Sequence, residues 1–501
     1  MPSIRKKSFA AEQLARQQQK KVSPVVWVLV GIVVVVLVVG GYVIYQRSAA
    51  EKQVETETQN IRSIAVLPFV DMSPEKDQAY LGDGIADAII NAINNVGELR
   101  VIDRTSSFQF RGKENAIDEI AEKLTVDAVL EGSVHKQEKR LRIMAQLIKV
   151  SDHSHFFLKN YDIDFSDIFT VQDSISLLVL KELKFTLMGK EKAAIVRRYT
   201  NDPDAYELYL QGLYYADLGS NSQGKAREYF QQAIDKDPDF ALAYAGLARV
   251  SRREEQKALL NKALELDGNL CEAYSLLAWI SLSEYWDFQA AEMNIKRALE
   301  LNPGNYEAFE VYSCYLRAMG RYEEALEVVH KAQELNPLPW FSYGQAIALY
   351  LRLGKYEEAR AQFKKAMEMN PESMYAKYHL ARIEYLSGNY DKALEFWQAV
   401  LKDYPEYERT SLLRIAYIHA LSGNKDKAEK ILQEQIIDSN SGYSIALVYT
   451  ALGDRDNAFI WLEKSYEKKT QNLIWLKSDP EFDPLRSDPR YKELTDKIGL
   501  P

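Results

Sequence analysis

The 501-residue chain has little of the chemistry that most enzyme classes need. It has only two cysteines, Cys271 and Cys314, without a C-x-x-C pair, and this excludes a disulfide framework and a cysteine zinc site. The six histidines are scattered, and the sequence contains no H-E-x-x-H, no G-x-S-x-G and no kinase or cyclase signature. We therefore expect no catalytic residues, no metal site and no cofactor.

A large excess of charge of one sign is also absent. The formal net charge is −9, so the sequence gives no reason to expect a nucleic-acid partner. Apolar residues make up 47% of the chain and charged residues 27%, as in ordinary folded proteins. The length is sufficient for two or three domains.

One stretch, GSNSQGKA at residues 219–226, nearly spells the phosphate-binding P-loop G-x-x-x-x-G-K-[ST]. A P-loop follows a strand and ends in Ser or Thr, whose hydroxyl binds the magnesium ion. Here the preceding YELYLQGLYYADL has a helical pattern, and Ala226 stands where the hydroxyl is needed. We interpret the stretch as a turn between two helices.

The longest apolar run is residues 25–45, VVWVLVGIVVVVLVVGGYVIY, and it contains no charge. As a helix it would span about 32 Å, enough to cross a bilayer. The basic residues of the tail at 1–24 predict a cytoplasmic N-terminus. A cleaved signal peptide is the competing interpretation, but its small-residue site at 48–50 is poor. The sequence thus predicts a transmembrane helix with the lipid bilayer as a partner, then a linker at 46–60.

Residues 61–188 alternate short apolar runs with amphipathic stretches. SIAVLPFV from Ser63 and LRVIDR from Leu99 are rich in strand formers, and YLGDGIADAIINAINNV between them has helical spacing. The whole segment reads β-α-β-α-β-β-β-α, which predicts a small α/β domain around a mixed sheet. Within it we interpret Asp83, between Gly82 and Gly84, as the residue that caps the first helix.

Five motifs of this domain occur together in one known family. They are IAVLPF, Y-L-G-D-G-I, R-V-I-D-R-T-S-S-F, V-D-A-V-L-E-G-S-V and D-I-F-T-V-Q-D. In this order they resemble the TolB-type amino-terminal domain of bacteria. The resemblance implies a domain on the outer side of the inner membrane beside a repeat array, and no catalytic residues are established for that family. Relatives often carry a DNA-binding, kinase or cyclase domain, for which the segment at 1–24 is too short.

From about residue 200 the sequence repeats itself every 34 residues. Prolines end ALELNP, AQELNP, AMEMNP and VLKDYP at positions 303, 337, 371 and 405. A turn glycine and a helix-packing alanine recur in phase with them, the pattern of the tetratricopeptide repeat (TPR), a pair of antiparallel helices. Such pairs stack into an all-α superhelix, or α-solenoid. We expect about eight repeats in residues 200–470 and a C-terminal cap in residues 471–501.

The first helices of stacked TPR pairs line a concave groove. In the sixth repeat the groove positions hold Tyr375, Tyr378, Arg382 and Tyr385, and Arg317 of the fourth repeat lies on the same face. An aromatic stripe with basic side chains suits an extended peptide, so these five residues are the candidate peptide-binding site. The alternative is that the tyrosines only pack against the neighbouring repeat.

Taken together, the sequence predicts a non-enzymatic, membrane-anchored scaffold in the bacterial inner membrane, with its folded domains periplasmic. It would bind protein partners through the TPR groove and the TolB-type domain. The alternative is an envelope signalling component that acts through a separate cytoplasmic partner, reached by residues 1–24. Partner identity and oligomeric state cannot be read from the sequence.

Overall fold

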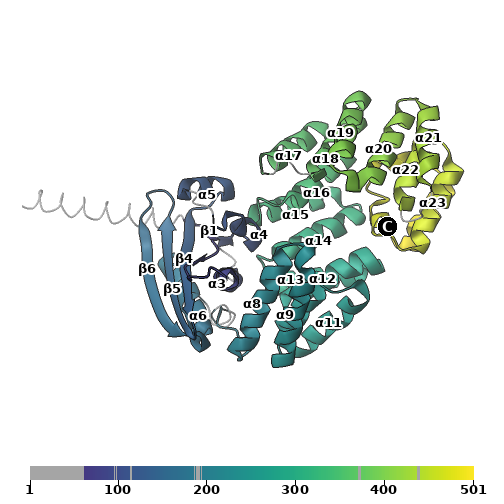
Figure 1. Ribbon diagram of the computed structural model, residues 1–501. Helices are drawn as coiled ribbons and strands as arrows, with labels where there is room; N and C mark the ends of the chain where they lie inside the picture. Colours follow the sequence, from purple (N-terminus) through teal and green to yellow (C-terminus); the bar gives the residue numbers. More distant parts are fainter. Residues whose placement is uncertain are drawn as a thin grey trace, which may run out of the picture. The chain divides into compact units, whose positions relative to one another are not determined.

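The computed structural model describes residues 61–501 with a few gaps. These gaps are residues 95, 97–98, 113–115, 186, 188–191, 193–194, 370–373 and 437–440, together with the side chains of residues 369 and 374–376. Arg62–Pro501 forms one compact unit, in which an α/β domain precedes an array of helices (Figure 1).

The α/β domain is built on one mixed sheet. Its strands are β1 (Ser63–Val66), β2 (Val70–Asp71), β3 (Arg100–Val101), β4 (Ala128–Gln137), β5 (Arg140–Lys149) and β6 (His155–Asp164). The order is β3-β1-β4-β5-β6, with β2 also paired to β4. Strand β1 is parallel to β3 and β4, whereas β4, β5 and β6 are antiparallel, as in the mixed sheet that the sequence pattern predicts.

The helices of this domain are α3 (Ala79–Ile93), α4 (Arg104–Ser107), α5 (Ile117–Leu124) and α6 (Ile168–Glu182). Every residue of β1 is buried, while β5 alternates buried and exposed residues, so the sheet has one solvated face at this edge. Helices α3 and α6 lie between the sheet and the helical array (Figure 1). Residues on α3 and α4 therefore reach the array directly.

In the described part of the chain, eight pairs of helices follow. They are α8 (Pro203–Asp217) and α9 (Gln223–Lys236), α10 (Ala241–Arg249) and α11 (Arg253–Leu266), α12 (Cys271–Ile280) and α13 (Phe288–Leu301), α14 (Tyr306–Ala318) and α15 (Tyr322–Leu335), α16 (Trp340–Arg352) and α17 (Tyr356–Met369), α18 (Met374–Leu386) and α19 (Tyr390–Asp403), α20 (Glu408–Leu421) and α21 (Lys425–Gln435), and α22 (Gly442–Leu452) and α23 (Arg455–Glu467). Stacking these pairs buries the apolar face that no single pair can bury alone.

The turn glycines do what the repeat pattern requires. The first helix of five successive pairs ends at a glycine in the left-handed region, with φ of 74°, 71°, 84°, 82° and 84° at Gly320, Gly354, Gly388, Gly423 and Gly453. This left-handed conformation lets the chain reverse into the second helix. Glycine adopts it readily, whereas residues with a Cβ rarely do.

The third repeat is one residue longer than the 34-residue period, since Pro303 follows Gly268 by 35 positions. A local change of helix type near Tyr285–Phe288 accommodates the extra residue. The π-helix η4 (Ser281–Tyr285) continues α12, and Trp286 then takes a φ of 55°. A π-turn absorbs one inserted residue without breaking the helix. Trp286 is buried, and the centre of its ring lies 5.6 Å from the ring centre of Tyr466 on α23. The insertion therefore also brings the third pair into contact with the last.

The stretch GSNSQGKA is the turn of the first pair, as the sequence indicates. The short 3-10 helix η3 (Ser220–Ser222) joins α8 to α9, and no strand precedes it in this part of the chain. The ammonium group of Lys225 lies 5.1 Å from the ring centre of Tyr215, and Ala226 is fully buried. Lys225, in the first turn of α9, thus forms a cation–π contact with the ring of Tyr215 on α8.

The chain ends in a segment that covers the last repeats. It consists of the 3-10 helices η7 (Gln471–Trp475) and η8 (Pro480–Leu485) and the helix α24 (Pro489–Ile498). Leu473, Phe482 and Leu494 are fully buried, so this segment completes the apolar core of the array.

The predicted fold class and localisation need a correction. Within the residues that the structure describes, no helix is long and apolar enough to cross a membrane. Helices α3, α6 and α8 have 15 residues each, against the roughly 20 apolar residues that a membrane span needs. The predicted span at 25–45, the tail at 1–24 and the linker at 46–60 lie outside the described residues. The structure supports a TPR solenoid with an α/β domain and gives no support to a single-pass inner-membrane protein.

Candidate functional site

The predicted groove residues are largely buried rather than open to a ligand. Arg317 on α14 is 5% exposed, and on α18 Arg382 is 4% and Tyr385 3% exposed. Tyr378 is half-buried, and the side chain of Tyr375 lies outside the described part. The sequence places Arg317, Arg382 and Tyr385 on one face, and the structure brings them together there.

The chain's own C-terminal segment covers these arginines. The Arg382 guanidinium donates from Nε to Oε1 of Glu481 at 2.6 Å and from Nη2 to Oε2 at 2.7 Å, a bidentate pair. Its Nη2 also donates to Oδ1 of Asp479 at 2.9 Å. The Nη2 of Arg317 donates to the same Asp479 oxygen at 2.8 Å. Two buried carboxylates therefore neutralise two buried arginines.

Two tyrosines complete the hydrogen bonding of these carboxylates. The hydroxyl of Tyr385 donates to Oε1 of Glu481 at 2.7 Å, and the hydroxyl of Tyr443 on α22 donates to Oδ2 of Asp479 at 2.8 Å. Burial would raise the pKa of Asp479, but Arg382 and Arg317 outweigh burial and hold its pKa below the usual value. The groove thus binds an acidic segment, residues 478–481, which runs from a turn into the first residues of η8, by charge-assisted hydrogen bonds.

A histidine in the same groove carries no charge at neutral pH. His379 is 9% exposed, and burial together with the nearby Arg382 and Arg317 lowers its pKa to about 3. The charge of the groove is therefore set by its arginines and by the two carboxylates of the C-terminal segment.

A third arginine of the groove has no carboxylate partner among the described residues. Arg414 on α20 is 8% exposed, its Nε has no hydrogen-bond partner, and its Nη2 donates only to the Tyr378 hydroxyl at 3.3 Å. Its guanidinium carbon lies 5.3 Å from the centre of the Tyr378 ring. Sequence reasoning missed Arg414, because it is not at one of the four groove positions of the repeat. The C-terminal segment thus leaves one positive charge unmatched.

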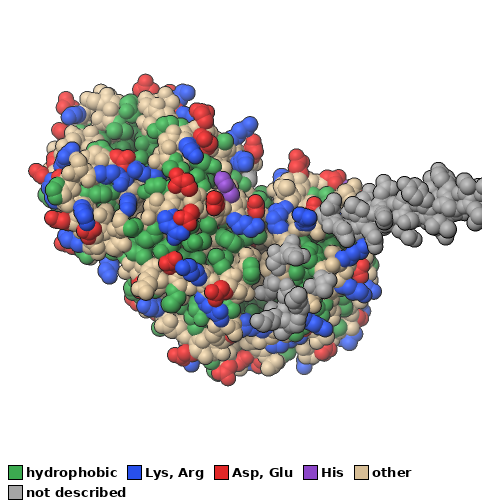
Figure 2. Space-filling view, turned by 180° about the vertical axis from the view of Figure 1, so that it is seen from behind, with side chains coloured by type: hydrophobic (Ala, Val, Ile, Leu, Met, Phe, Trp, Pro, Cys, Tyr) green, Lys and Arg blue, Asp and Glu red, His purple; other side chains and the backbone are tan. Residues whose placement is uncertain are grey.

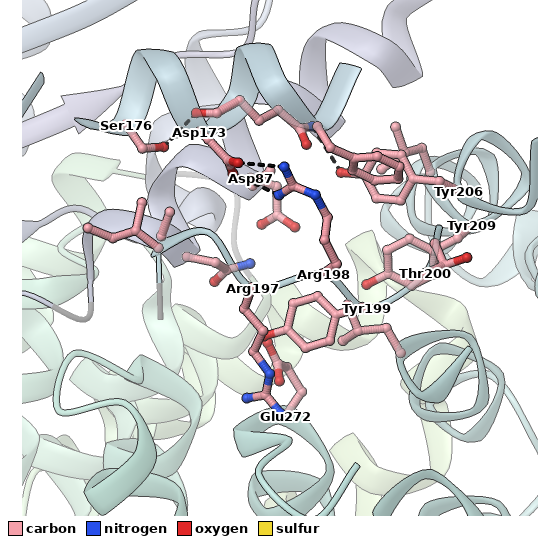
Figure 3. Close-up of a pocket in the computed structure, with 18 residues that line it drawn as sticks. Asp87, Asp173, Ser176, Arg197, Arg198, Tyr199, Thr200, Tyr206, Tyr209 and Glu272 are labelled. Atoms are coloured by element: carbon pink, nitrogen blue, oxygen red, sulfur yellow. Dashed lines mark hydrogen bonds and ion pairs between the residues drawn. The ribbon is translucent and has the colours of Figure 1, made fainter. Parts of the chain in front are cut away.

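A second candidate site lies where the α/β domain meets the first repeats. Two adjoining cavities of about 100 Å³ and 390 Å³ share five lining residues, Asp87, Asn91, Tyr209, Leu242 and Glu272. The smaller cavity is also lined by the rings of Phe169, Tyr199 and Tyr206. Figure 3 shows Asp87 and Glu272 on opposite sides of this space, with Tyr199, Tyr206 and Tyr209 at its wall. We call the two cavities together the interdomain cleft.

Arginines on both sides of the cleft are held by carboxylates. Arg104 on α4 lies 3.5 Å from Asp87 on α3 and 2.5 Å from Asp217 on α8, so it ties the two domains together. Arg249 on α10 pairs with Glu307 on α14. These bonds give the cleft a fixed polar lining.

Asp83, expected as a helix cap, has another role. Helix α3 begins at Ala79 after Gln78, so Asp83 lies in its second turn and is 4% exposed. Its carboxylate pairs with Arg111, which lines the larger cavity. Burial raises the pKa of Asp83 to about 6, although Arg111 opposes this.

Glu272 lines both cavities and has no arginine or lysine partner among the described residues. It accepts a hydrogen bond from the thiol of the neighbouring Cys271 at 3.3 Å. Burial raises the pKa of Glu272, and the carboxylates of Asp87 and Glu307 raise it further. Three carboxylates from α3, α12 and α14 therefore repel one another across the same space.

Behind this cleft, Glu310 gives a testable pH dependence. Burial raises the pKa of Glu310 to about 8 from its ordinary 4.5, although the Tyr306 hydroxyl donates to it, and nearby Glu307 adds to the rise. The stability from this raised pKa is fully present below pH 4.5 and is lost as pH rises through about 8. We expect Glu310→Gln to reduce the fall in Tm between about pH 5 and pH 8, measured by scanning calorimetry.

The matched control is Glu300→Gln, because Glu300 is exposed on α13. This substitution should leave the slope of Tm against pH as it is in the unchanged protein. An unaltered slope in Glu310→Gln would contradict the assignment.

Outside these sites, the surface shows no separation of charge by sign on the face that Figure 2 presents. There, Lys and Arg side chains of the described residues are interspersed with Asp and Glu. Many exposed charges of the described residues pair with a charge three or four residues away, such as Arg321 with Glu324 and Lys492 with Asp496. Exposed pairs of this kind contribute little to stability.

Two family models match parts of the chain. Residues 343–408 match a tetratricopeptide repeat model, and residues 59–177 match the second domain of HilA/YgeH-like transcriptional regulators. The array of helix pairs and the first match agree, so the chain contains tetratricopeptide repeats. The TolB-type identity of the α/β domain is not shown by these matches and stays a prediction.

Two curated relatives match shorter regions. The putative adenylate cyclase 3 of Rhizobium meliloti (strain 1021) is 36% identical over 190 residues, which is 38% of this chain and 32% of that protein. The photosystem I assembly protein Ycf3 of Dioscorea elephantipes is 30% identical over 102 residues, 20% of this chain and 48% of that protein. The chain thus spans about a third and about a half of these relatives.

Solved TPR structures match with low similarity. A tetratricopeptide repeat protein from Parabacteroides merdae ATCC 43184 has 18% identity and a TM-score of 0.35, over 60% of this chain and 100% of that one. YrrB, a TPR protein with an unusual peptide-binding site, has 23% identity and a TM-score of 0.27, over 35% of this chain and 91% of that one.

Proposed function

We propose that this protein is a non-enzymatic scaffold that binds protein partners through its TPR array, with the α/β domain as a second binding surface. The observation that carries the proposal is the binding of residues 478–481 in the concave groove. Arg317, Arg382 and Tyr385 hold the carboxylates of this acidic segment there by direct hydrogen bonds. A groove that holds an acidic segment of its own chain has the chemistry to hold one from another protein.

A partner peptide could bind this groove either by displacing the C-terminal segment or beside that segment. Where the C-terminal segment lies, a partner reaches Arg317 and Arg382 only by displacing it. Next to this segment, Tyr378 is half-buried, and the buried Arg414 forms no hydrogen bond with a carboxylate among the described residues. We propose that a partner peptide first engages the groove positions Tyr375 and Tyr378, because the half-buried ring of Tyr378 lies over the guanidinium of Arg414.

The test uses the photo-crosslinking amino acid p-benzoylphenylalanine in place of Tyr378 in the full chain. Irradiation in living cells followed by mass spectrometry should yield one or a few discrete protein adducts. The matched control places the same amino acid at Tyr356, a half-buried tyrosine on α17, which is a second helix and does not line the groove. Identical adducts from both positions, or none from Tyr378, would count against a groove-binding scaffold.

A regulatory component that acts through a separate partner is the second candidate. Two observations favour it: the match of residues 59–177 to a domain of transcriptional regulators, and the relative named as a putative adenylate cyclase. Under this alternative the TolB-like α/β domain passes a signal to an output protein. Discrete adducts from p-benzoylphenylalanine at Leu158, an exposed residue of β6, with none from the same amino acid at Tyr378, would support this candidate over the scaffold.

A further inference from the structure

The interdomain cleft is too large to be a packing defect. Native protein interiors contain few voids larger than a water molecule. The larger cavity measures about 390 Å³, which falls in the range of about 300–1,000 Å³ typical of small-molecule sites. It lies between α3 and α4 on one side and the first helices of the first four repeats on the other. Arg317 and Arg382, which hold the C-terminal segment, do not line this space.

The lining of the larger cavity has more carboxylates than cations. Its charged residues are Asp87, Asp103, Asp217, Glu272 and Glu307 against Arg104, Arg111 and Arg249. Arg111 is already neutralised by Asp83, which is not part of the lining. Two arginines therefore remain for five carboxylates, and the space is electronegative.

The aromatic walls of the smaller cavity supply a second, independent feature. Tyr206 and Tyr209 lie nearly parallel, with ring centres 6.3 Å apart. Beside them, the guanidinium carbon of Arg198 lies 5.3 Å from the ring centre of Phe169. One side of this cavity thus already holds a cation against an aromatic face, and the Tyr209 ring faces both cavities.

The carboxylates are dispersed and do not form a metal site. No three His, Cys, Asp or Glu side chains of the described residues lie close enough together to hold one metal ion. Asp87, Glu272 and Glu307 come from three helices and face the cavity from different sides. An elongated ligand with separated positive charges fits this arrangement better than a compact ion.

We propose that the interdomain cleft binds a small organic cation that carries one or two ammonium groups. Glu272 and Asp87 accept hydrogen bonds from the ammonium groups, and the ring of Tyr209 forms the wall against which the alkyl chain packs. Because α3 belongs to the α/β domain and α12 to the array, the bound cation links the two. This site lies at the N-terminal end of the concave face, among residues other than Arg317 and Arg382, and binding of an organic cation there goes beyond the scaffold function.

The test measures thermal stability and binding heat of the full chain with 1,4-diaminobutane as the probe, at neutral pH and constant ionic strength. We expect the diamine to raise Tm and to bind measurably in calorimetry. The neutral analogue 1,4-butanediol, which has the same length, should do neither. Absence of a diamine effect, or an equal effect of the diol, would overturn the proposal.

Two variants separate site binding from general attraction to an acidic protein. Glu272→Gln keeps the size of the side chain and should weaken diamine binding about tenfold, because a charge-assisted hydrogen bond is lost. Glu265→Gln removes a carboxylate that is exposed on α11 and should leave the affinity unchanged. Equal affinities of Glu272→Gln and the unchanged protein, with both folded by Tm, would show that the amine binds elsewhere.

Discussion

Replacing Arg382 by methionine is expected to lower the free energy of unfolding of the array by about 3–5 kcal/mol, because it leaves two buried carboxylates without their main cation. Glu481 is 4% exposed and loses its bidentate partner, and Asp479 keeps Arg317 as its one cation together with the Tyr443 hydroxyl. Methionine fills much of the volume of the arginine stem, so the loss reports on charge rather than on a cavity. Scanning calorimetry gives the Tm, and limited proteolysis near residues 475–486 reports release of the segment.

Arg352→Met is the matched control for Arg382→Met. The guanidinium of Arg352 also bonds a carboxylate of the C-terminal segment, Asp483, at 2.6 Å. That carboxylate is 46% exposed, and pairs of this kind contribute about 0–1 kcal/mol. An equal loss of stability in the two variants would contradict the claim that the buried Arg382–Glu481 pair holds the C-terminal segment more strongly than the exposed Arg352–Asp483 pair.

The second large effect is expected at Gly82 in α3. A Cβ at this position would lie 1.9 Å from the carbonyl oxygen of Phe69, and a backbone atom cannot rotate away as a side chain can. The Phe69 amide also donates to the Gly82 carbonyl at 3.3 Å, so the two segments run in direct contact. We expect Gly82→Ala to destabilise the α/β domain by about 3 kcal/mol or more, measured by denaturant unfolding.

Gly224→Ala is the control with the opposite sign. Gly224 lies inside α9 in the stretch GSNSQGKA, and no heavy atom outside its own helix lies within 4 Å of a Cβ built there. Gly224 is the second residue of α9, where alanine adopts the helical φ and ψ without strain, so the substitution should stabilise the protein by about 0.4–1 kcal/mol. Loss of stability in Gly224→Ala, or none in Gly82→Ala, would contradict the packing described for these two glycines.

The repeats were readable in the sequence because their determinants are local. A glycine that needs a positive φ recurs every 34 or so residues, and the structure places Gly320 and Gly354 in that conformation. The same periodicity put Arg317 and Arg382 on the concave face, where they lie. The bilayer-spanning segment predicted at 25–45 also followed from a local pattern, but it is outside the described residues and no described helix supports it.

What the sequence did not reveal depends on contacts between distant segments. Glu481 lies 99 residues from Arg382, and no repeat period relates them. The stretch SDPEFDP lies within residues 471–501, which the sequence predicts as a cap over the last repeat, and that prediction does not say which residues its carboxylates contact. The interdomain cleft has the same origin, since Asp87 and Glu272 meet only when the α/β domain packs against the array. Each of them alone resembles an ordinary solvated carboxylate.

The anchoring of the C-terminal segment has a consequence for how the protein is made. Helix pairs of a solenoid fold from local contacts, so the early repeats can form while the chain is still being synthesised. Arg317, however, finds its partner Ser478 only 161 residues later. Until the ribosome has released residues 475–485, Arg317 and Arg382 face water and the late repeats lack part of their core. In a nascent chain these two buried arginines therefore lack their carboxylate partners until residues 479–481 have left the ribosome.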